Sequence, residues 1–279
     1  MFLKLMYITN NPRVALIAEK YGVDRIMIDL ETLGKDERQK GMNTVKSNHT
    51  IEDIQLISKL LTKSEMLVRI NPWNENSLTE IEKVISSGAK RIMLPMWRTA
   101  DEVTCFLEAV GGRVNTMLLL ETKEAVENID EVLKNPLIDE IHIGLNDLHL
   151  SYGLSFMFEL LSNGIVEMLC KKFREKKISY GFGGIARIGE GMLPAENIIM
   201  EHYRLGSSRV ILSRSFCNAE ELVDIDLIES VFSKNMALLI DYENKLEKCS
   251  SLNYDENVKF IKNNVNVIVN KIKEKRVDE

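Results

Sequence analysis

The chain has 279 residues, of which 45% are hydrophobic and 28% are charged, and a formal net charge of −6, a profile typical of an ordinary globular protein. The negative balance argues against nucleic acid as a partner, because affinity for a phosphate backbone needs clustered positive charge. No apolar run approaches the roughly 18 residues of a membrane helix, and the N-terminus lacks a signal-peptide layout, so no membrane partner is expected.

Short β-rich runs recur along the chain with helical stretches between them. They lie at residues 3–8, 25–30, 66–70, 91–94, 116–120, 140–143, 178–182 and 209–212. Most are continuous apolar runs, as expected for parallel strands that are covered on both faces. Eight such alternations within about 240 residues predict an α/β protein of the (β/α)8 TIM-barrel class.

The stretches between these runs carry helix signals. Ser77 and Glu80, and likewise Thr99 and Glu102, have the spacing of capping boxes, in which a hydroxyl and a carboxylate satisfy the free N–H groups of a first turn. After Glu121 one apolar stripe of helical spacing is formed by Ala125, Ile129, Val132 and Leu133. We therefore expect helices to cover the outside of the barrel.

The segment at residues 181–191 allows two further readings. Gly181-x-Gly183-x-x-Ala186 imitates a dinucleotide fingerprint, but it follows the seventh β-rich run and not the first, which argues against a doubly wound sheet. Its glycines, together with Arg187, also suit an anion-binding loop after the seventh strand. The alternative is a loop whose glycines only permit tight turns.

The C-terminal part of the chain predicts a helical extension. We expect a barrel domain at residues 1–248 and an extension at 249–279. A seam of nearly heptad spacing runs through Val258, Ile261, Val265, Ile268 and Ile272. A barrel closes without this last helix, so we expect it to pack on a neighbouring subunit of a homo-oligomer, the alternative being that it folds back on its own barrel.

Four cysteines indicate a reducing compartment. Cys105, Cys170, Cys217 and Cys249 are far apart and form no CxxC pair. Neither a disulfide framework nor a structural zinc site is expected, and the cytoplasm is the predicted location.

Two carboxylates stand where β-rich runs end. Glu121 closes the fifth run, and Asp147 follows the sixth. Because the ends of neighbouring parallel strands meet at one edge, the two side chains are expected to converge in a pocket and hold a hard divalent cation. For either residue alone, an ordinary loop carboxylate is the alternative.

Five segments, in order along the chain, resemble one known family. They lie at residues 28–31, 68–72, 88–95, 121–131 and 138–148. Together they are similar to the HpcH/HpaI aldolase and citrate lyase β-subunit family, which includes metal-dependent class II pyruvate aldolases. The resemblance implies a TIM barrel, a divalent metal, and cleavage or formation of a carbon–carbon bond next to a 2-oxo acid or an acyl thioester.

The resemblance also implies roles for particular residues. The family's two metal ligands fall on Glu121 and Asp147, its substrate-binding arginine on Arg69, and its backbone-opening glycine on Gly144. Asn146 is a further candidate contact to substrate, although its position also suits shaping the turn. The cation expected first is Mg²⁺, with Mn²⁺ or Co²⁺ as alternatives.

These residues predict an aldolase-type lyase. A 2-oxo acid such as pyruvate and an aldehyde would be the small-molecule partners, and a metal-stabilised enolate would form when the bond of the 4-hydroxy-2-oxo acid breaks. The alternatives are a citrate-lyase-like cleavage of an acyl-CoA thioester and a barrel that binds a small acid without catalysis.

The chain departs from the family at the general base. Thr32 stands where the pyruvate aldolases place a histidine, and a threonine hydroxyl is no base at neutral pH. Asp29 and Glu31 remain as carboxylates near the same position, and His49 on the following loop is a third candidate. The alternative for His49 is a solvated or helix-capping side chain.

Overall fold

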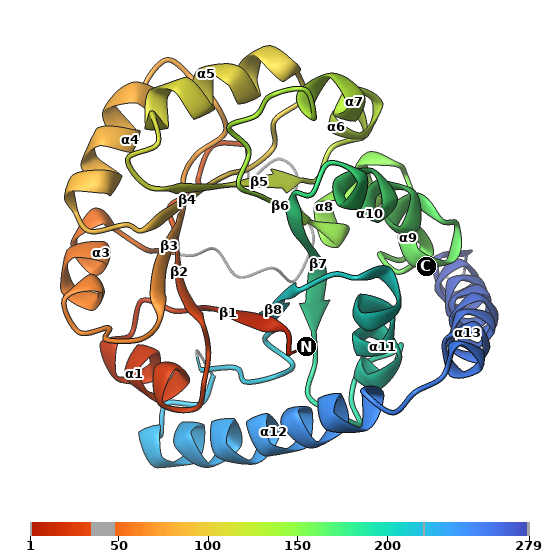
Figure 1. The fold of residues 1–279 in the computed structure, drawn as a ribbon. Helices are drawn as coiled ribbons and strands as arrows, with labels where there is room; N and C mark the ends of the chain where they lie inside the picture. The colour runs from red at the N-terminus through yellow and green to blue at the C-terminus, as the bar shows by residue number, and fades with distance from the viewer. Residues whose placement is uncertain (1, 35–47, 220, 278–279) are drawn as a thin grey trace.

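The structure, a computed structural model, describes residues 2–34, 48–219 and 221–277. Eight parallel strands form a closed barrel in chain order, which confirms the predicted TIM barrel (Figure 1). The strands are β1 (Lys4–Ile8), β2 (Arg25–Asp29), β3 (Glu65–Arg69), β4 (Arg91–Leu94), β5 (Asn115–Leu120), β6 (Glu140–Ile143), β7 (Ser179–Ile185) and β8 (Arg209–Leu212).

Helices surround the barrel (Figure 1). They are α1 (Pro12–Lys20), α3 (Ile51–Ser58), α4 (Ser77–Ser86), α5 (Ala100–Val110), α6 (Lys123–Glu127), α7 (Ile129–Val132), α8 (Leu145–Ser151), α9 (Glu159–Ser162), α10 (Ile165–Glu175) and α11 (Ala195–Leu205). The apolar stripe expected on one helix is divided between α6 and α7, with Asn128 between them.

One of the two predicted capping boxes is present. Thr99 and Glu102 satisfy each other's backbone N–H groups at the start of α5. At α4 the N-cap is Asn76, and the prediction for Ser77 and Glu80 is wrong. Glu80 instead accepts hydrogen bonds from Asn71, at 2.8 Å from Nδ2 and 3.2 Å from the backbone nitrogen, just beyond the end of β3.

The glycine-rich motif lies inside a strand. Strand β7 continues to Ile185, so the loop that follows it begins at Ala186 and not at Gly183 as expected. A Cβ added at Gly181 would lie 2.2 Å from the backbone oxygen of Arg209. Gly181 therefore permits close approach of β7 to β8, and the motif has no role in opening a helix for a dinucleotide.

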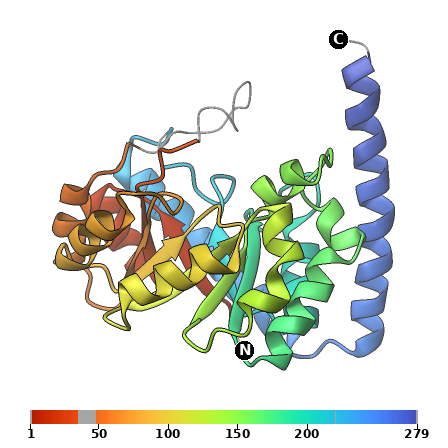
Figure 2. The ribbon, with the colours of Figure 1, turned by 90° about the horizontal axis from the view of Figure 1, so that it is seen from above.

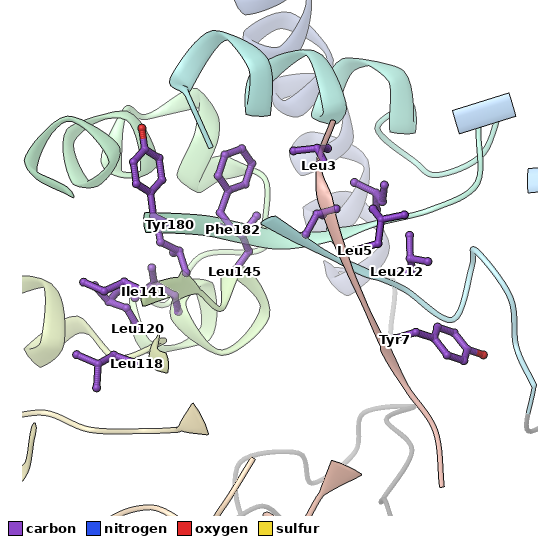
Figure 3. Close-up of a cluster of buried hydrophobic side chains, with 14 of the residues drawn as sticks. Leu3, Leu5, Tyr7, Leu118, Leu120, Ile141, Leu145, Tyr180, Phe182 and Leu212 are labelled. Atoms are coloured by element: carbon purple, nitrogen blue, oxygen red, sulfur yellow. The ribbon is translucent and has the colours of Figure 1, made fainter. Parts of the chain in front are cut away.

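Two apolar layers hold the barrel together. Outward-facing strand side chains pack beneath the helices, as Figure 3 shows for Leu118, Ile141 and Phe182. A smaller cluster packs separately from it and is formed by Met6, Met27, Leu67, Met93, Met117 and Leu119. Each of these buried side chains contributes roughly 1.5–3 kcal/mol to folding relative to an exposed position.

An ion-pair network lies among side chains at the N-terminal ends of the strands. Glu140 accepts two hydrogen bonds from Arg25, at 2.7 and 2.9 Å, and another from Nε of Arg209 at 2.7 Å. Although burial raises the pKa of Glu140, these arginines lower it below its ordinary value. The arginines of this network thus have carboxylate partners, as in a structural ion-pair cluster. A site is expected at the barrel mouth, defined here as the C-terminal ends of the strands.

Two long helices follow the barrel. They are α12 (Ile225–Leu246) and α13 (Ser251–Val277), and the predicted boundary at residues 248–249 falls between them. Helix α13 packs on α9 and α11 of its own chain, with Ile261 and Val265 buried, and its C-terminal part projects past the barrel (Figure 2). Asn257 joins it to α11 by donating to Glu201 Oε1 at 3.0 Å.

Exchange of this extension between subunits stays a prediction, and its last two residues lie outside the described part of the chain. In the ranges that the structure describes, no helix combines the length and the apolar character needed to cross a membrane.

Candidate active site at the barrel mouth

The predicted site residues lie at the barrel mouth, at or just after the ends of β2, β3, β5 and β6. Asp29 ends β2 and Arg69 ends β3. Glu121 directly follows β5, and Asp147 lies in the first turn of α8, the helix that follows β6. This is the end at which TIM-barrel enzymes carry their catalytic groups.

Glu121 is fixed by the segments on both sides of it. Its side chain is buried, and Oε1 accepts a hydrogen bond of 3.0 Å from the backbone nitrogen of Met96. Met96 has a positive φ of 53°, uncommon for a residue with a side chain, and it lies just past β4. Gly144 packs against the same carboxylate, because a Cβ added there would lie only 2.9 Å from Glu121 Oε2.

The pKa of the Glu121 carboxyl reflects both its burial and the charges around it. Burial raises the pKa of Glu121 well above its ordinary value, and the negative charges of Asp147 and then Glu31 raise it further. The charge of Arg69 and the hydrogen bond from the Met96 N–H lower the pKa of Glu121, but by less. The negative charge of Asp147 therefore acts on Glu121, in a region of excess negative charge, and their joint role as ligands stays a prediction.

This donor set fits a divalent cation. A buried carboxylate whose pKa is raised by a neighbouring negative charge, as for Glu121, is stabilised when a cation neutralises it, and carboxylate oxygens are the ligands that Mg²⁺ and Mn²⁺ prefer. No group of three or more candidate ligand side chains (His, Cys, Asp or Glu) occurs within the described residues. Glu121 and Asp147 would thus hold the ion as a pair, and the remaining positions would be open to substrate and water.

Arg69 is held in place by Asp29. The guanidinium donates from Nε and Nη2 to the two oxygens of Asp29, both at 2.8 Å, and Nη1 lies 3.4 Å from Glu31 Oε2. Burial lowers the pKa of Arg69, but the charges of Asp29, Glu31 and Glu121 raise it above its ordinary value, so the group is a permanent cation. A bidentate pair of this kind fixes the orientation of the guanidinium.

His49 reaches the site through one ring nitrogen. The backbone nitrogen of Asp29 donates a hydrogen bond of 3.0 Å to His49 Nδ1. Since Nδ1 accepts, the neutral ring carries its proton on Nε2. A base role would therefore require that this contact break, whereas a role in holding Asp29 follows directly from the geometry.

Sequence reasoning missed the partner of Thr32. Asn71 Oδ1 accepts hydrogen bonds from the Thr32 backbone nitrogen at 2.9 Å and from its hydroxyl at 3.2 Å, and the Asn71 amide in turn donates to Glu80. The Asn-Pro pair after β3 signalled a turn but not this contact. Thr32, at the position of the family histidine, thus holds the loop after β2 to the loop after β3.

Asn146 lies beside Asp147 but is exposed, in the first turn of α8. Its predicted contact with substrate stays a prediction. The lack of a side chain at Gly144 leaves room for the Glu121 carboxylate, and the predicted role of Gly144 beside the bound acid stays a prediction.

Known proteins resemble this chain in sequence pattern and in fold. The model of the HpcH/HpaI aldolase/citrate lyase family matches residues 3–159. No curated protein matches the sequence.

Three solved structures share the fold, each with a TM-score of 0.59. An HpcH/HpaI aldolase from Desulfitobacterium hafniense DCB-2 is 16% identical, with 82% of this chain and 93% of that chain covered. An HpcH/HpaI aldolase/citrate lyase family protein from Burkholderia cenocepacia J2315 is 12% identical, with 81% and 95% covered. The citrate synthase SbnG is 16% identical, with 82% and 93% covered. The family match spans more than half of the chain, and the chain therefore belongs to the HpcH/HpaI aldolase/citrate lyase family, a family of lyases.

Proposed function

We propose that the protein is a divalent-metal-dependent carbon–carbon lyase of the aldolase type. Its substrate would be a 4-hydroxy-2-oxo acid, cleaved to pyruvate or a related 2-oxo acid and an aldehyde, or formed from them. The observation that carries the proposal is the convergence of Glu121 and Asp147 beside the cationic Arg69 at the barrel mouth.

Glu121 and Asp147 would hold the metal, with Mg²⁺, Mn²⁺ and Co²⁺ as the candidates. A bound divalent cation supplies Lewis-acid polarisation of the 2-oxo acid's oxygens. Arg69 would pair with the negative charge that grows on the substrate as the carbon–carbon bond breaks, and Asp29 would keep the guanidinium aimed at it. Gly144 would leave space for the acid beside Glu121.

Glu31 is the base that these contacts favour. Both oxygens of Asp29 accept hydrogen bonds from Arg69 at 2.8 Å, and Glu31 Oε2 lies 3.4 Å from Arg69 Nη1, next to the cation that would bind the substrate. Glu31 would take the proton of the 4-hydroxyl, the bond between C3 and C4 would break, and its electron pair would remain on C3. The aldehyde would leave, and a proton returned to C3 would complete the 2-oxo acid.

The test is release of pyruvate from 4-hydroxy-2-oxo acids in the presence of each metal. We expect metal-dependent turnover that Glu31→Gln lowers by about 10²–10⁴-fold, the usual contribution of a general base. Glu127→Gln, at an exposed carboxylate on α6, serves as the control. Formation of acetyl-CoA from an acyl-CoA substrate, without pyruvate release, would instead support the citrate-lyase-like alternative.

A further inference from the structure

The end of β3 holds the loop after β2 at two points. Arg69, the last residue of β3, donates to both oxygens of Asp29 and lies 3.4 Å from Glu31. Asn71, two residues further along, binds the same loop through backbone groups, because its Oδ1 accepts from the two backbone nitrogens that follow Glu31, at 2.9 and 3.0 Å. Side chains and backbone of this loop are therefore both held from the end of β3.

One amide oxygen receives three donors from this loop. Asn71 Oδ1 accepts from the backbone nitrogen of Thr32, from the Thr32 hydroxyl at 3.2 Å, and from the backbone nitrogen of Leu33. Thr32 and Leu33 are both exposed, so water takes over these groups once the amide is removed. The path of the chain just after Glu31 therefore depends on Asn71.

Glu80 orients the Asn71 amide. Its Oε1 accepts from Asn71 Nδ2 at 2.8 Å and from the Asn71 backbone nitrogen at 3.2 Å. Burial raises the pKa of Glu80, and the two hydrogen bonds from Asn71 oppose that rise. Because a carboxylate oxygen accepts and an amide nitrogen donates, Nδ2 must face Glu80 and Oδ1 must face Thr32. This unit, called here the Asn71 clamp, is formed by Thr32, Leu33, Asn71 and Glu80.

Glu31 is enclosed between this clamp and Asp29. The backbone nitrogen of Glu31 donates to Asp29 Oδ1 at 3.2 Å, and the clamp holds the two residues that come next. The Glu31 side chain is buried, with 2% of it exposed, beside Arg69. The backbone anchors on both sides of Glu31 therefore determine where its carboxylate lies.

We propose that Asn71 is a positioning residue that holds Glu31 against Arg69. Glu80 supports it by fixing the orientation of the amide. The inference rests on the proposed function, in which Glu31 takes the proton of the 4-hydroxyl. Thr32 stands where the pyruvate aldolases place a histidine, and the clamp binds that same threonine. A carboxylate that acts without this histidine needs a fixed position, because a displacement of about 1 Å can lower turnover by about 10²-fold.

Hydrogen exchange tests the clamp without any substrate. In Asn71→Ala the amide protons of Thr32 and Leu33 should exchange with deuterated water at least about tenfold faster than in the wild type, as followed by NMR. Asn74→Ala is the matched control, because the Asn74 side chain donates to Pro72 O and accepts from Asn76 N, both in the loop after β3. Unchanged exchange in Asn71→Ala, or equal acceleration in both variants, would overturn the clamp.

Steady-state kinetics test the positioning role. The substrate is 4-hydroxy-2-oxopentanoate, which is cleaved to pyruvate and acetaldehyde. Asn71→Ala should lower kcat by about 10–100-fold and change KM by less than about threefold, because Arg69 keeps its bidentate pair with Asp29. Asn74→Ala should leave both constants within about twofold of the wild type. A rise in KM without a fall in kcat would contradict the positioning of a base.

A double-mutant cycle shows whether Asn71 acts through Glu31. In a protein that already carries Glu31→Gln, adding Asn71→Ala should lower kcat by no more than about twofold, because the group that Asn71 positions is gone. If the losses of the two single variants multiply in the double variant, Asn71 acts independently of Glu31 and the inference is wrong.

Two substitutions of Glu80 test the orientation of the amide. Glu80→Gln keeps an oxygen that accepts from Asn71 and should retain kcat within about threefold of the wild type. Glu80→Leu has a similar size but no acceptor, and it should lower kcat and speed exchange of the Thr32 amide, as Asn71→Ala does. Equal effects of the two substitutions would contradict the role of Glu80.

The proposed function fails separately. Wild-type protein that releases no pyruvate with Mg²⁺, Mn²⁺ or Co²⁺ would refute the lyase mechanism and with it the positioning role, whatever the amide exchange shows of the clamp. Turnover that Glu31→Gln lowers and Asn71→Ala leaves unchanged would refute only the positioning role.

Discussion

At the residue scale, the site is organised by contacts to backbone as much as by side chains. The Asp29 backbone nitrogen donates to His49, while the Asp29 carboxylate accepts from Arg69. One residue thus connects the loop that carries His49 to the cation that would bind substrate. Glu121 is similarly fixed by the backbone N–H of Met96. Such second contacts hold reactive groups within a narrow range of positions.

Substitution of His49 separates a positioning role from a base role. His49→Ala should lower turnover by more than about tenfold, because Asp29 and Arg69 lose an anchor worth one hydrogen bond or more. His49→Asn offers an acceptor oxygen near the position of Nδ1 and should restore most of the activity. Metal affinity, measured by calorimetry, should not change in either variant.

If His49 were the general base, the two substitutions would have a different effect on turnover. Both substitutions would then abolish turnover equally, and the ascending limb of the pH–rate profile would disappear. Unchanged turnover in His49→Ala would remove the residue from the mechanism.

At the scale of elements, the mouth depends on how closely α8 approaches the end of β5. Gly144 joins β6 to α8, and its backbone nitrogen donates to Leu120 O at 2.9 Å. This bond keeps the turn beside Glu121 and brings the first turn of α8, with Asp147, to the same place. This one strand-to-helix connection therefore keeps the charge of Asp147 close enough to act on Glu121.

Gly144→Ala tests this connection. The φ of Gly144 is −81°, which alanine adopts freely, so the damage should come from the added methyl group against Glu121 Oε2 at 2.9 Å. We expect turnover to fall by at least about tenfold, while circular dichroism shows an intact barrel, since a misplaced ligand costs catalysis before it costs folding.

Gly184→Ala is the matched control, because its added methyl group would lie 3.3 Å from Ile211 O and not against a site side chain. Equal loss of activity in both variants would show that the effect of Gly144→Ala is not local.

A second prediction at this scale concerns the C-terminal helix α13. Ile261 is buried where α13 packs on its own barrel, and its replacement by alanine should lower the free energy of unfolding by about 2–5 kcal/mol. If α13 packs within one chain, chemical denaturation should show this loss at every protein concentration and the solution mass should not change. A loss that depends on concentration, together with a lower mass, would indicate exchange between subunits.

At the scale of the whole molecule, two buried histidines link stability to pH. His142, in β6, is buried, and burial lowers its pKa to about 4, while the pKa of His202 in α11 is also lowered, first by burial and then by His142. The His202 ring stacks on Phe182 at 3.7 Å between ring centres. Neither ring accepts a proton in the folded state at pH 5.

The unfolded chain therefore binds more protons than the folded one between about pH 4 and 6.5, and stability must fall as the pH falls through this window. For His142 the loss should be on the order of 3 kcal/mol by pH 4. Urea denaturation at pH 7 and at pH 5 measures the free energy of unfolding. The difference between these two free energies should be smaller in His142→Asn than in the wild type. An equal difference in wild type and variant would contradict the assignment. Glu140, whose pKa is lowered, loses its contribution only at more acidic pH.

The sequence was enough to predict the order and type of the strands. Parallel strands that are buried on both faces are continuous apolar runs, and such runs can be recognised from the sequence alone. It also placed Arg69 and Glu121 at the ends of β3 and β5, and Asp147 in the segment after β6, which the structure shows as the first turn of α8. It could not predict that Asp29 is engaged by Arg69 or that Asn71 binds Thr32, because these contacts join loops far apart in the chain. The capping box predicted at Ser77 is absent for a more local reason, since Asn71, nine residues before Glu80, donates to the Glu80 carboxylate.

The central claim is that Glu121 and Asp147 hold one divalent cation that activates a 2-oxo acid. Exchange of the pyruvate methyl protons with deuterated water, followed by NMR with and without Mg²⁺, Mn²⁺ or Co²⁺, tests it most directly. We predict metal-dependent exchange in the wild-type protein that Glu121→Gln and Asp147→Asn each abolish. The account would be contradicted if the wild-type protein showed no exchange with any of these metals, or if both variants exchanged the methyl protons as fast as the wild type.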